Sequence, residues 1–235
     1  MATLGYIGHS AFTIEHSGKT IAIDPFISGN PSATISPDDV APSVILLTHA
    51  HNDHVGDTVK IAKRTGAEVV ATHELAGFLG SKGVENAVGM NHGGRYAFDG
   101  GTVKMVPAWH TSAYQEEDGT FVAPGVPAGL IVTLGEGEDQ KKIYFAGDTC
   151  VFFDMQLIGE EELDVAVLPV GDHFTMGPKD AIRALKFLRP KAVIPCHCNT
   201  FPLIEQNLDE FKKMVEDETQ VKPVILDPGQ TWEIE

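Results

Sequence analysis

The feature that most constrains this chain is a dense cluster of histidines and aspartate directly after the apolar run 44–47. Its members are His49, His51, Asp53 and His54. The apolar run predicts a short buried strand, and residues 57–64 predict the start of a helix, so the cluster lies on a strand-to-helix turn. Zinc, manganese, iron and nickel accept neutral imidazole and carboxylate ligands. The cluster therefore predicts a metal site, because histidines this dense in a merely polar turn would repel one another when protonated.

The spacing of the cluster favours two metals over one. On an extended backbone the side chains of His49, His51 and Asp53 point the same way, whereas His54 turns off as the helix begins. Two ligand sets with different directions suit two adjacent metal ions.

The order His-Ala-His-Asn-Asp-His, followed by a single His, a Gly-Asp and a further His, resembles the metallo-β-lactamase superfamily pattern H-x-H-x-D-H…H…D…H. Further stretches resemble the "metal-dependent hydrolase" subfamily near the L-ascorbate-6-phosphate lactonases. These stretches are 23–31, 48–57, 147–149, 171–178 and 197–202. The resemblance runs almost end to end. It implies an α/β (α+β) fold, a four-layer αββα sandwich, with residues 1–235 as a single hydrolase domain.

The resemblance also implies a ligand set for two divalent metal ions. One ion would be held by His49, His51 and His110, and the other by Asp53, His54 and His197. Asp148 would bridge the two ions, because a carboxylate has two oxygens. Zinc is the first expectation, and the same ligands suit manganese, nickel or iron.

Five other polar residues are candidates for contacts with the ligands or the substrate: His9, Asp24, His173, Asn199 and Thr200. Asp24 resembles the Asp-Pro of the fold that orients a ligand histidine, and the alternative is a strand-ending turn. His9 and His173 resemble active-site loop positions that hold substrate or act as an acid, and the alternative is a surface histidine. Asn199 and Thr200 either bond substrate or cap the next turn.

Three cysteines, Cys150, Cys196 and Cys198, do not suggest a disulfide framework. Strand alternation turns the sulfurs of Cys196 and Cys198 away from the imidazole of His197. We expect all three to be buried packing thiols.

The rest of the chain predicts alternating strands and helices with ligands at strand ends, as in one α/β domain. Strands are expected at 6–7, 12–14, 20–23, 44–47, 68–71, 102–106, 130–134, 142–146, 165–169, 192–195, 224–226 and 231–234, and helices near 57–65, 74–81, 178–188 and 205–217. Two long loops, 25–43 and 111–127, are expected to be functional. Tyr114 and Phe121 of the second loop could form part of a substrate wall.

Composition limits the partners. A formal charge of −16 argues against a nucleic-acid backbone, because phosphate binding normally needs clustered Lys and Arg. No apolar run approaches the length of a membrane span, and no signal peptide is visible, so a cytoplasmic protein is expected. Homo-oligomers are common among related lactonases and are left open here.

Together these features predict a metal-dependent hydrolase with a small-molecule substrate: an ester, lactone or phosphoester. The resemblance implies a hydroxide bridging two metals as the nucleophile, with Asp53 and Asp148 as catalytic residues. Asn52 stands where related di-iron redox proteins place Glu, which favours hydrolysis. The alternatives are a phosphodiesterase or nuclease, and a metal-binding scaffold without turnover. The general acid is not identified, and a true β-lactamase is disfavoured by the missing secretory signal.

Overall fold

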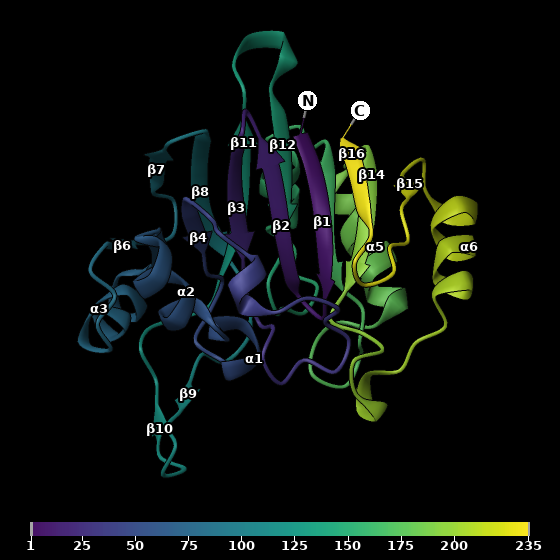
Figure 1. Cartoon of the computed structure of the whole chain (residues 1–235). Coiled ribbons are helices and arrows are strands. Elements are labelled where there is room, and N and C mark those ends of the chain that lie inside the picture. Colours follow the sequence, from purple (N-terminus) through teal and green to yellow (C-terminus); the bar gives the residue numbers. More distant parts are fainter. Residues whose placement is uncertain (1, 235) are drawn as a thin grey trace.

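Two seven-stranded sheets pack face to face, with helices on their outer faces (Figure 1). The computed structural model describes residues 2–234. The first sheet has the order β16 (Thr231–Ile234), β1 (Ala2–Gly8), β2 (Ala11–His16), β3 (Lys19–Ile23), β4 (Val44–Leu46), β5 (Glu68–Thr72), β6 (Ala87–Met90). The second has the order β15 (Lys222–Pro223), β14 (Ala192–Cys196), β13 (Val165–Pro169), β12 (Lys141–Phe145), β11 (Ala128–Leu134), β8 (Gly101–Pro107), β7 (Arg95–Phe98).

Six α-helices and a small hairpin complete the described part of the chain. The helices are α1 (Asn52–Val55), α2 (Thr58–Thr65), α3 (His73–Ser81), α4 (Met155–Gly159), α5 (Pro178–Leu188) and α6 (Leu208–Glu218). The 3₁₀ turns are Pro37–Asp39, Gly137–Asp139 and Pro202–Ile204. The hairpin of β9 (Tyr114–Gln115) and β10 (Phe121–Val122) extends away from the sheets at the same end as α1 (Figure 1). No helix among residues 2–234 is long and apolar enough to cross a membrane.

Three apolar clusters account for the layers. The largest lies between the sheets, where Phe12 and Ile14 of β2 and Phe145 of β12 are buried. A second fills the space between the second sheet and α4, α5 and α6, and a third lies between the first sheet and α2 and α3. Each sheet therefore buries both faces, as its nearly continuous apolar strands require. This is the four-layer αββα sandwich that the sequence predicted.

Strand direction brings the predicted ligands to one edge of the sandwich. In the first sheet β3, β4 and β5 are parallel, and β1 runs the same way because β2 is antiparallel to both β1 and β3. In the second sheet β12, β13 and β14 are parallel, and β8 runs with them because both β8 and β12 are antiparallel to β11. Side chains that follow these strands meet at the C-terminal edges.

The two sheets are joined at this edge by backbone hydrogen bonds. The amide of Ala128 donates to the carbonyl of Thr48 over 2.9 Å, and the amide of His197 donates to the carbonyl of His9 over 2.8 Å. Gly147 lies in the same contact with φ +62°, and a Cβ there would be 2.8 Å from Thr48 Cβ. Glycine is thus required by both backbone conformation and close approach.

Several sequence predictions need correction. The strand expected at 224–226 is wrong: β15 covers only residues 222–223. The edge strands β6 and β7 were not predicted, because most of their residues are exposed or half-buried and lack a clear apolar alternation. The ligand run itself contains a helical turn, α1, and the loop 111–127 contains the β9–β10 hairpin. Elements this short carry too little periodicity to be recognised.

We expect Gly147→Ala to destabilise the protein more than Gly18→Ala does. Both glycines have positive φ, but nothing lies within 4 Å of a Cβ at Gly18. The backbone cost, about 1 kcal/mol, is common to both variants. Overpacking against Thr48 should add about 1–3 kcal/mol for Gly147→Ala. Urea unfolding measures the difference; equal losses would show that the contact between the sheets tolerates an extra methyl group.

Candidate metal centre

Seven histidine and aspartate side chains, those predicted as ligands, meet at the joined edge of the sheets, and His9 joins them. They form two groups: His49, His51, His110 and Asp148 in one, and His9, Asp53, His54 and His197 in the other. Within each group the possible ligand atoms all lie within 4.8 Å of one another. The structure thus brings together residues that follow five different strands, β1, β4, β8, β12 and β14.

In the first group, imidazole nitrogens face one another. His49 Nε2 lies 3.0 Å from His51 Nδ1. Burial, together with the neighbouring His54, lowers the pKa of His49 well below its ordinary value, and burial also lowers the pKa values of His51 and His110. The rings are therefore neutral, which is the form that binds metals. Two ring nitrogens at this distance share either a proton or a bound cation.

Asp24 fixes which nitrogen of each ring carries the proton. Its Oδ1 accepts from the amide of Thr48 (2.8 Å), and its Oδ2 accepts from the Thr48 hydroxyl (2.6 Å) and from His54 Nδ1 (2.8 Å). Because the Thr48 hydroxyl proton is used in this way, its oxygen accepts from His49 Nδ1 over 3.0 Å. The Nε2 atoms of His49 and His54 are left as acceptors that point into the site. The structure thus gives Asp24 the orienting contact that its Asp-Pro resemblance implied.

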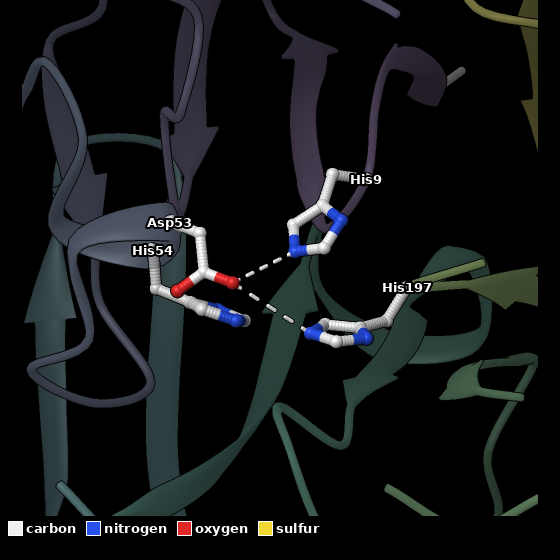
Figure 2. A group of neighbouring side chains, drawn as sticks. All are labelled: His9, Asp53, His54 and His197. Carbon is white, nitrogen blue, oxygen red and sulfur yellow. Dashed lines mark hydrogen bonds and ion pairs between the residues drawn. The ribbon is translucent and has the colours of Figure 1, made fainter. Parts of the chain in front are cut away.

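Figure 2 shows the second group, in which Asp53 lies between His9 and His197. Asp53 Oδ2 is 3.0 Å from His9 Nε2 and 3.8 Å from His197 Nε2. Burial alone would raise the pKa of Asp53, but the hydrogen bond from His9 and the nearby His54 hold it below its ordinary value. Asp53 is 34% exposed, whereas the histidines of this group are buried, so this carboxylate lies at the solvent side.

Asp148 contacts both groups. Its Oδ1 lies 3.3 Å from His54 Nε2, and its Oδ2 lies 3.1 Å from His197 Nε2 and 3.4 Å from His110 Nε2. Burial alone would raise the pKa of Asp148, but His197 and His54 hold it well below its ordinary value. His54 Nε2 and Asp148 Oδ1 are buried without a well-aligned hydrogen-bond partner. Buried polar atoms are rarely left in this state, and a cation would satisfy both.

The charges in the site also favour a cation. Burial alone would lower the pKa of His54, but the carboxylates of Asp148 and Asp24 outweigh it and raise the pKa well above its ordinary value. A positive charge is therefore favoured at this position, and a divalent metal would supply it. The donor set of imidazoles and carboxylates, without thiolate, fits such an ion.

His9 is a fully buried residue, so the surface alternative for it is wrong. Its Nδ1 is 3.0 Å from the Thr200 hydroxyl, and its Nε2 faces the acceptor Asp53. Burial lowers the pKa of His9 to about 4, so the ring is neutral. A neutral ring that donates from Nε2 to Asp53 must accept from Thr200 at Nδ1. In this arrangement His9 and Thr200 orient Asp53.

His173 and Asn199 are not brought into the groups. His173 is exposed and packs edge-on against Phe174, at 4.6 Å between ring centroids. The side-chain oxygen of Asn199 accepts from the amide of Gln206 over 2.7 Å, which is the turn-capping alternative. Their neighbouring motifs resembled the family, but sequence proximity to a motif does not set the side-chain direction.

Two residues that support the site were not singled out from the sequence. Thr48 is the link between Asp24 and His49 described above. Asp57 Oδ2 accepts from the amides of Ile27 (3.1 Å) and Ser28 (2.7 Å), which holds the loop after β3 against the start of α2. Thr48 and Asp57 are the first and last residues of the stretch 48–57, which contains four of the predicted ligands. That position was the only sequence feature that could have indicated their supporting role.

Three site residues have left-handed backbone conformations: His9 with φ 60°, Asp24 with φ 42° and His197 with φ 51°. Non-glycine residues adopt this region rarely, and it costs of order 1 kcal/mol or more. Each of these residues directly follows a strand, β1, β3 and β14 in turn. The turn aims the side chain across the edge of the sheets, and the hydrogen bond between His197 and His9 holds two of the turns in place.

The expectation that all three cysteines are buried is wrong for Cys150, which is exposed. It follows Asp148 by two residues in a loop, where strand alternation no longer applies. Cys196 and Cys198 are buried as expected, Cys196 between the sheets and Cys198 under the outer helices.

Residues 3–197 match the beta-lactamase superfamily domain. The chain is 48% identical to a metal-dependent hydrolase of Methanopyrus kandleri over 230 residues, covering 97% of this chain and 98% of the relative. It is 47% identical to a metal-dependent hydrolase of Thermus thermophilus, and all of both chains is covered. Among solved structures it is similar to Igni18, a metallo hydrolase of Ignicoccus hospitalis, with a TM-score of 0.87, 39% identity and coverage of 100% and 99%.

The fold, the two ligand groups and these similarities define the class: the chain belongs to the beta-lactamase superfamily. Within it, the chain belongs to the family of metal-dependent hydrolases that the relatives from Methanopyrus kandleri and Thermus thermophilus represent. The closer resemblance to L-ascorbate-6-phosphate lactonases stays a prediction.

We expect Asp24→Asn to weaken metal binding by about 10–100-fold, the usual effect of losing a partner that orients metal ligands. An amide nitrogen in the Oδ2 position would oppose both the Thr48 hydroxyl and the His54 Nδ1 proton, and in the Oδ1 position it would oppose the Thr48 backbone amide, so either orientation disrupts the hydrogen bonds that orient the rings. Competition with a chelator measures the affinity. Asp38→Asn, in an exposed ion pair with Lys60, is the control, and equal affinities in the two variants would contradict this role for Asp24.

Iodoacetamide at pH 8 should alkylate one thiol per folded chain, at Cys150. Burial raises the pKa of Cys198 to about 12 and raises the pKa of Cys196 well above its ordinary value, so neither forms the reactive thiolate. Mass spectrometry of peptides identifies the modified site, and unfolding in urea should expose all three. Modification of Cys196 or Cys198 in the folded protein would contradict the packing described here.

Proposed function

We propose that the protein is a dinuclear metallohydrolase that cleaves a small ester, lactone or phosphoester. The observation that carries the proposal is the position of Asp148, whose two carboxylate oxygens reach nitrogen atoms of both ligand groups. A single carboxylate between two sets of neutral imidazoles is the arrangement expected for two adjacent cations.

The ligand roles follow from the directions of the donor atoms. His49 Nε2, His51 Nδ1 and His110 Nε2 would hold one ion, and Asp53, His54 Nε2 and His197 Nε2 would hold the other. Asp148 would bridge them. The bound ions would supply an acidified water molecule and stabilise negative charge on the substrate oxygen. Zinc is our first choice of metal, because a thiol-free set of histidine and aspartate ligands with open positions suits it.

The protein side chains have separate tasks. Asp24 and Thr48 keep the ring protons of His54 and His49 away from the site, so that both Nε2 atoms stay acceptors. His9, held by Thr200, donates a hydrogen bond to Oδ2 of Asp53 and keeps that carboxylate ionised. Asp53 is the partly exposed, ionised carboxylate of the second group, and it would orient the attacking water by accepting a hydrogen bond from it.

A matched pair of buried aspartates tests the proposal. Asp164 is buried in the second sheet, where it accepts from the Lys142 amide (2.8 Å) and the Lys191 ammonium (2.7 Å). We expect about two metal ions per chain in the reconstituted wild type and in Asp164→Asn. Asp148→Asn should hold fewer metal ions and hydrolyse test esters at least about 100-fold more slowly, because one oxygen ligand and its charge are lost.

Metal content is measured by inductively coupled plasma mass spectrometry, and turnover is measured with nitrophenyl esters and lactones. Absence of bound metal after reconstitution, or unchanged turnover in Asp148→Asn, would contradict the proposal. A wild-type protein with two metals and no turnover would instead favour a binding scaffold.

A further inference from the structure

Lysine and arginine are missing from all the loops that frame the candidate metal centre. These loops are 24–43, 47–57, 107–127, 146–154, 170–177 and 197–207. They make up about one third of the 235 residues, yet all 17 Lys and Arg lie elsewhere in the chain. Proteins recognise phosphate groups chiefly with these cations. The rim of the site therefore offers no such partner from its own loops.

The basic residues that contact these loops from neighbouring helices already have partners there. The Arg64 guanidinium donates to the carbonyls of Pro37 and Val40, and Lys60 pairs with Asp38. The Lys82 ammonium donates to both oxygens of Glu116 over 2.6 and 2.7 Å. Lys179 is the nearest along the sequence, two residues after loop 170–177, and it is an exposed residue in the first turn of α5.

Large exposed aromatic side chains lie on four of these loops; besides Phe121 and Phe153, they are Trp109, Phe174 and Phe201. Trp109 is 66% exposed, Phe174 52% and Phe201 37%. Trp109 directly precedes His110, and the Phe201 ring lies 5.6 Å from that of His9. Exposed apolar groups gathered beside a polar site usually mark a binding surface.

Hydrogen bonds hold two of these loops on Thr149, the residue after Asp148. The Trp109 amide donates to the Thr149 hydroxyl over 3.0 Å, and the Met176 amide, two residues after Phe174, donates to the Thr149 carbonyl over 3.0 Å. The loops of Trp109 and Phe174 are thus anchored by their main-chain amides to the residue that follows Asp148.

We propose that the substrate is a neutral ester or lactone that carries an apolar group, aromatic or branched aliphatic, beside the scissile bond. This inference rests on the proposed function and narrows it by excluding phosphoesters. In the reaction the carbonyl carbon gains an oxygen from water while its bond to the alkoxy oxygen breaks. The alkoxy oxygen takes up a proton from the water, and the products are a carboxylic acid and an alcohol, which stay in one molecule as a hydroxy acid when the substrate is a lactone.

Substrates that share the nitrophenyl leaving group distinguish apolar esters, small esters and phosphoesters. On the metal-loaded protein, nitrophenyl phenylacetate should have a kcat/KM at least about 10-fold above nitrophenyl acetate, since binding removes its phenyl group from water. Nitrophenyl phosphate and bis-nitrophenyl phosphate should be hydrolysed more slowly than both esters. Faster turnover of either phosphoester, or no preference for the phenylacetyl group, would overturn the inference while leaving the hydrolase proposal in place.

Variants locate the preference. Trp109→Ala and Phe201→Ala should lower the ratio of kcat/KM between phenylacetate and acetate esters toward one, chiefly through KM, with metal content checked in each. Leu157→Ala removes a side chain of similar exposure, 63%, from the outer helix α4 and should leave the ratio unchanged. If the ratio of kcat/KM between the phenylacetate and acetate esters were unchanged in both aromatic variants, the phenyl group would not bind at Trp109 and Phe201.

A binding measurement tests the preference for an apolar group without relying on turnover. Calorimetric titration of the metal-loaded protein should show phenylacetate binding at least about 10-fold more tightly than acetate, with the difference lost in Trp109→Ala. Inorganic phosphate should bind no more tightly in wild type than in Lys179→Ala. If no ester is hydrolysed but phenylacetate still binds preferentially, the hydrolase proposal fails and the apolar site stands. Equal binding of acetate and phenylacetate overturns the apolar site.

Discussion

The site depends on the three hydrogen bonds that the buried carboxylate of Asp24 accepts from Thr48 and His54. A carboxylate has no proton to donate, so its partners must be donors, and through Thr48 this requirement extends to His49. One residue outside the ligand set thereby decides that two imidazoles present lone pairs to the metal positions. Without it, the same rings could hold their protons on either nitrogen, and the donor atoms would not converge.

Burying so many polar groups together costs free energy of folding, and the packing of the two surrounding sheets offsets this cost. Neutral imidazoles and ionised carboxylates are placed together in a region of low exposure, where unpaired groups are unfavourable. The nearly continuous apolar strands of both sheets bury three layers of side chains, and backbone hydrogen bonds join the sheets beside the ligands. That rigidity also holds His9, Asp24 and His197 in left-handed conformations that an isolated loop would leave.

Two parts of the site bear on two different questions: the ligand groups on the class of reaction, and the charges of the framing loops on the proposed substrate. The ligand groups explain a metal-dependent hydrolase, and relatives across bacteria and archaea carry that description. The framing loops, on which the proposed substrate preference rests, combine acidic and aromatic residues without a single Lys or Arg. A formal charge of −16 would by itself say little about a substrate, because bound cations offset it locally; the position of the cations is the informative quantity.

Apolar periodicity in the sequence by itself predicted most of the main strands and helices, because periodicity is a local property. The resemblance of the motifs to a known superfamily predicted the fold class and the seven His and Asp residues that the structure brings together. Asp24, His9 and Thr200 were recognised as candidates, but only the tertiary structure decided that the first orients His54 and that the other two support Asp53. The same is true of the open alternatives: the structure shows His173 as an exposed residue and Asn199 as a turn cap, and it corrects the prediction that Cys150 is buried. Side-chain direction after a strand depends on left-handed turns and on contacts between distant segments, and neither is encoded in a short window of sequence.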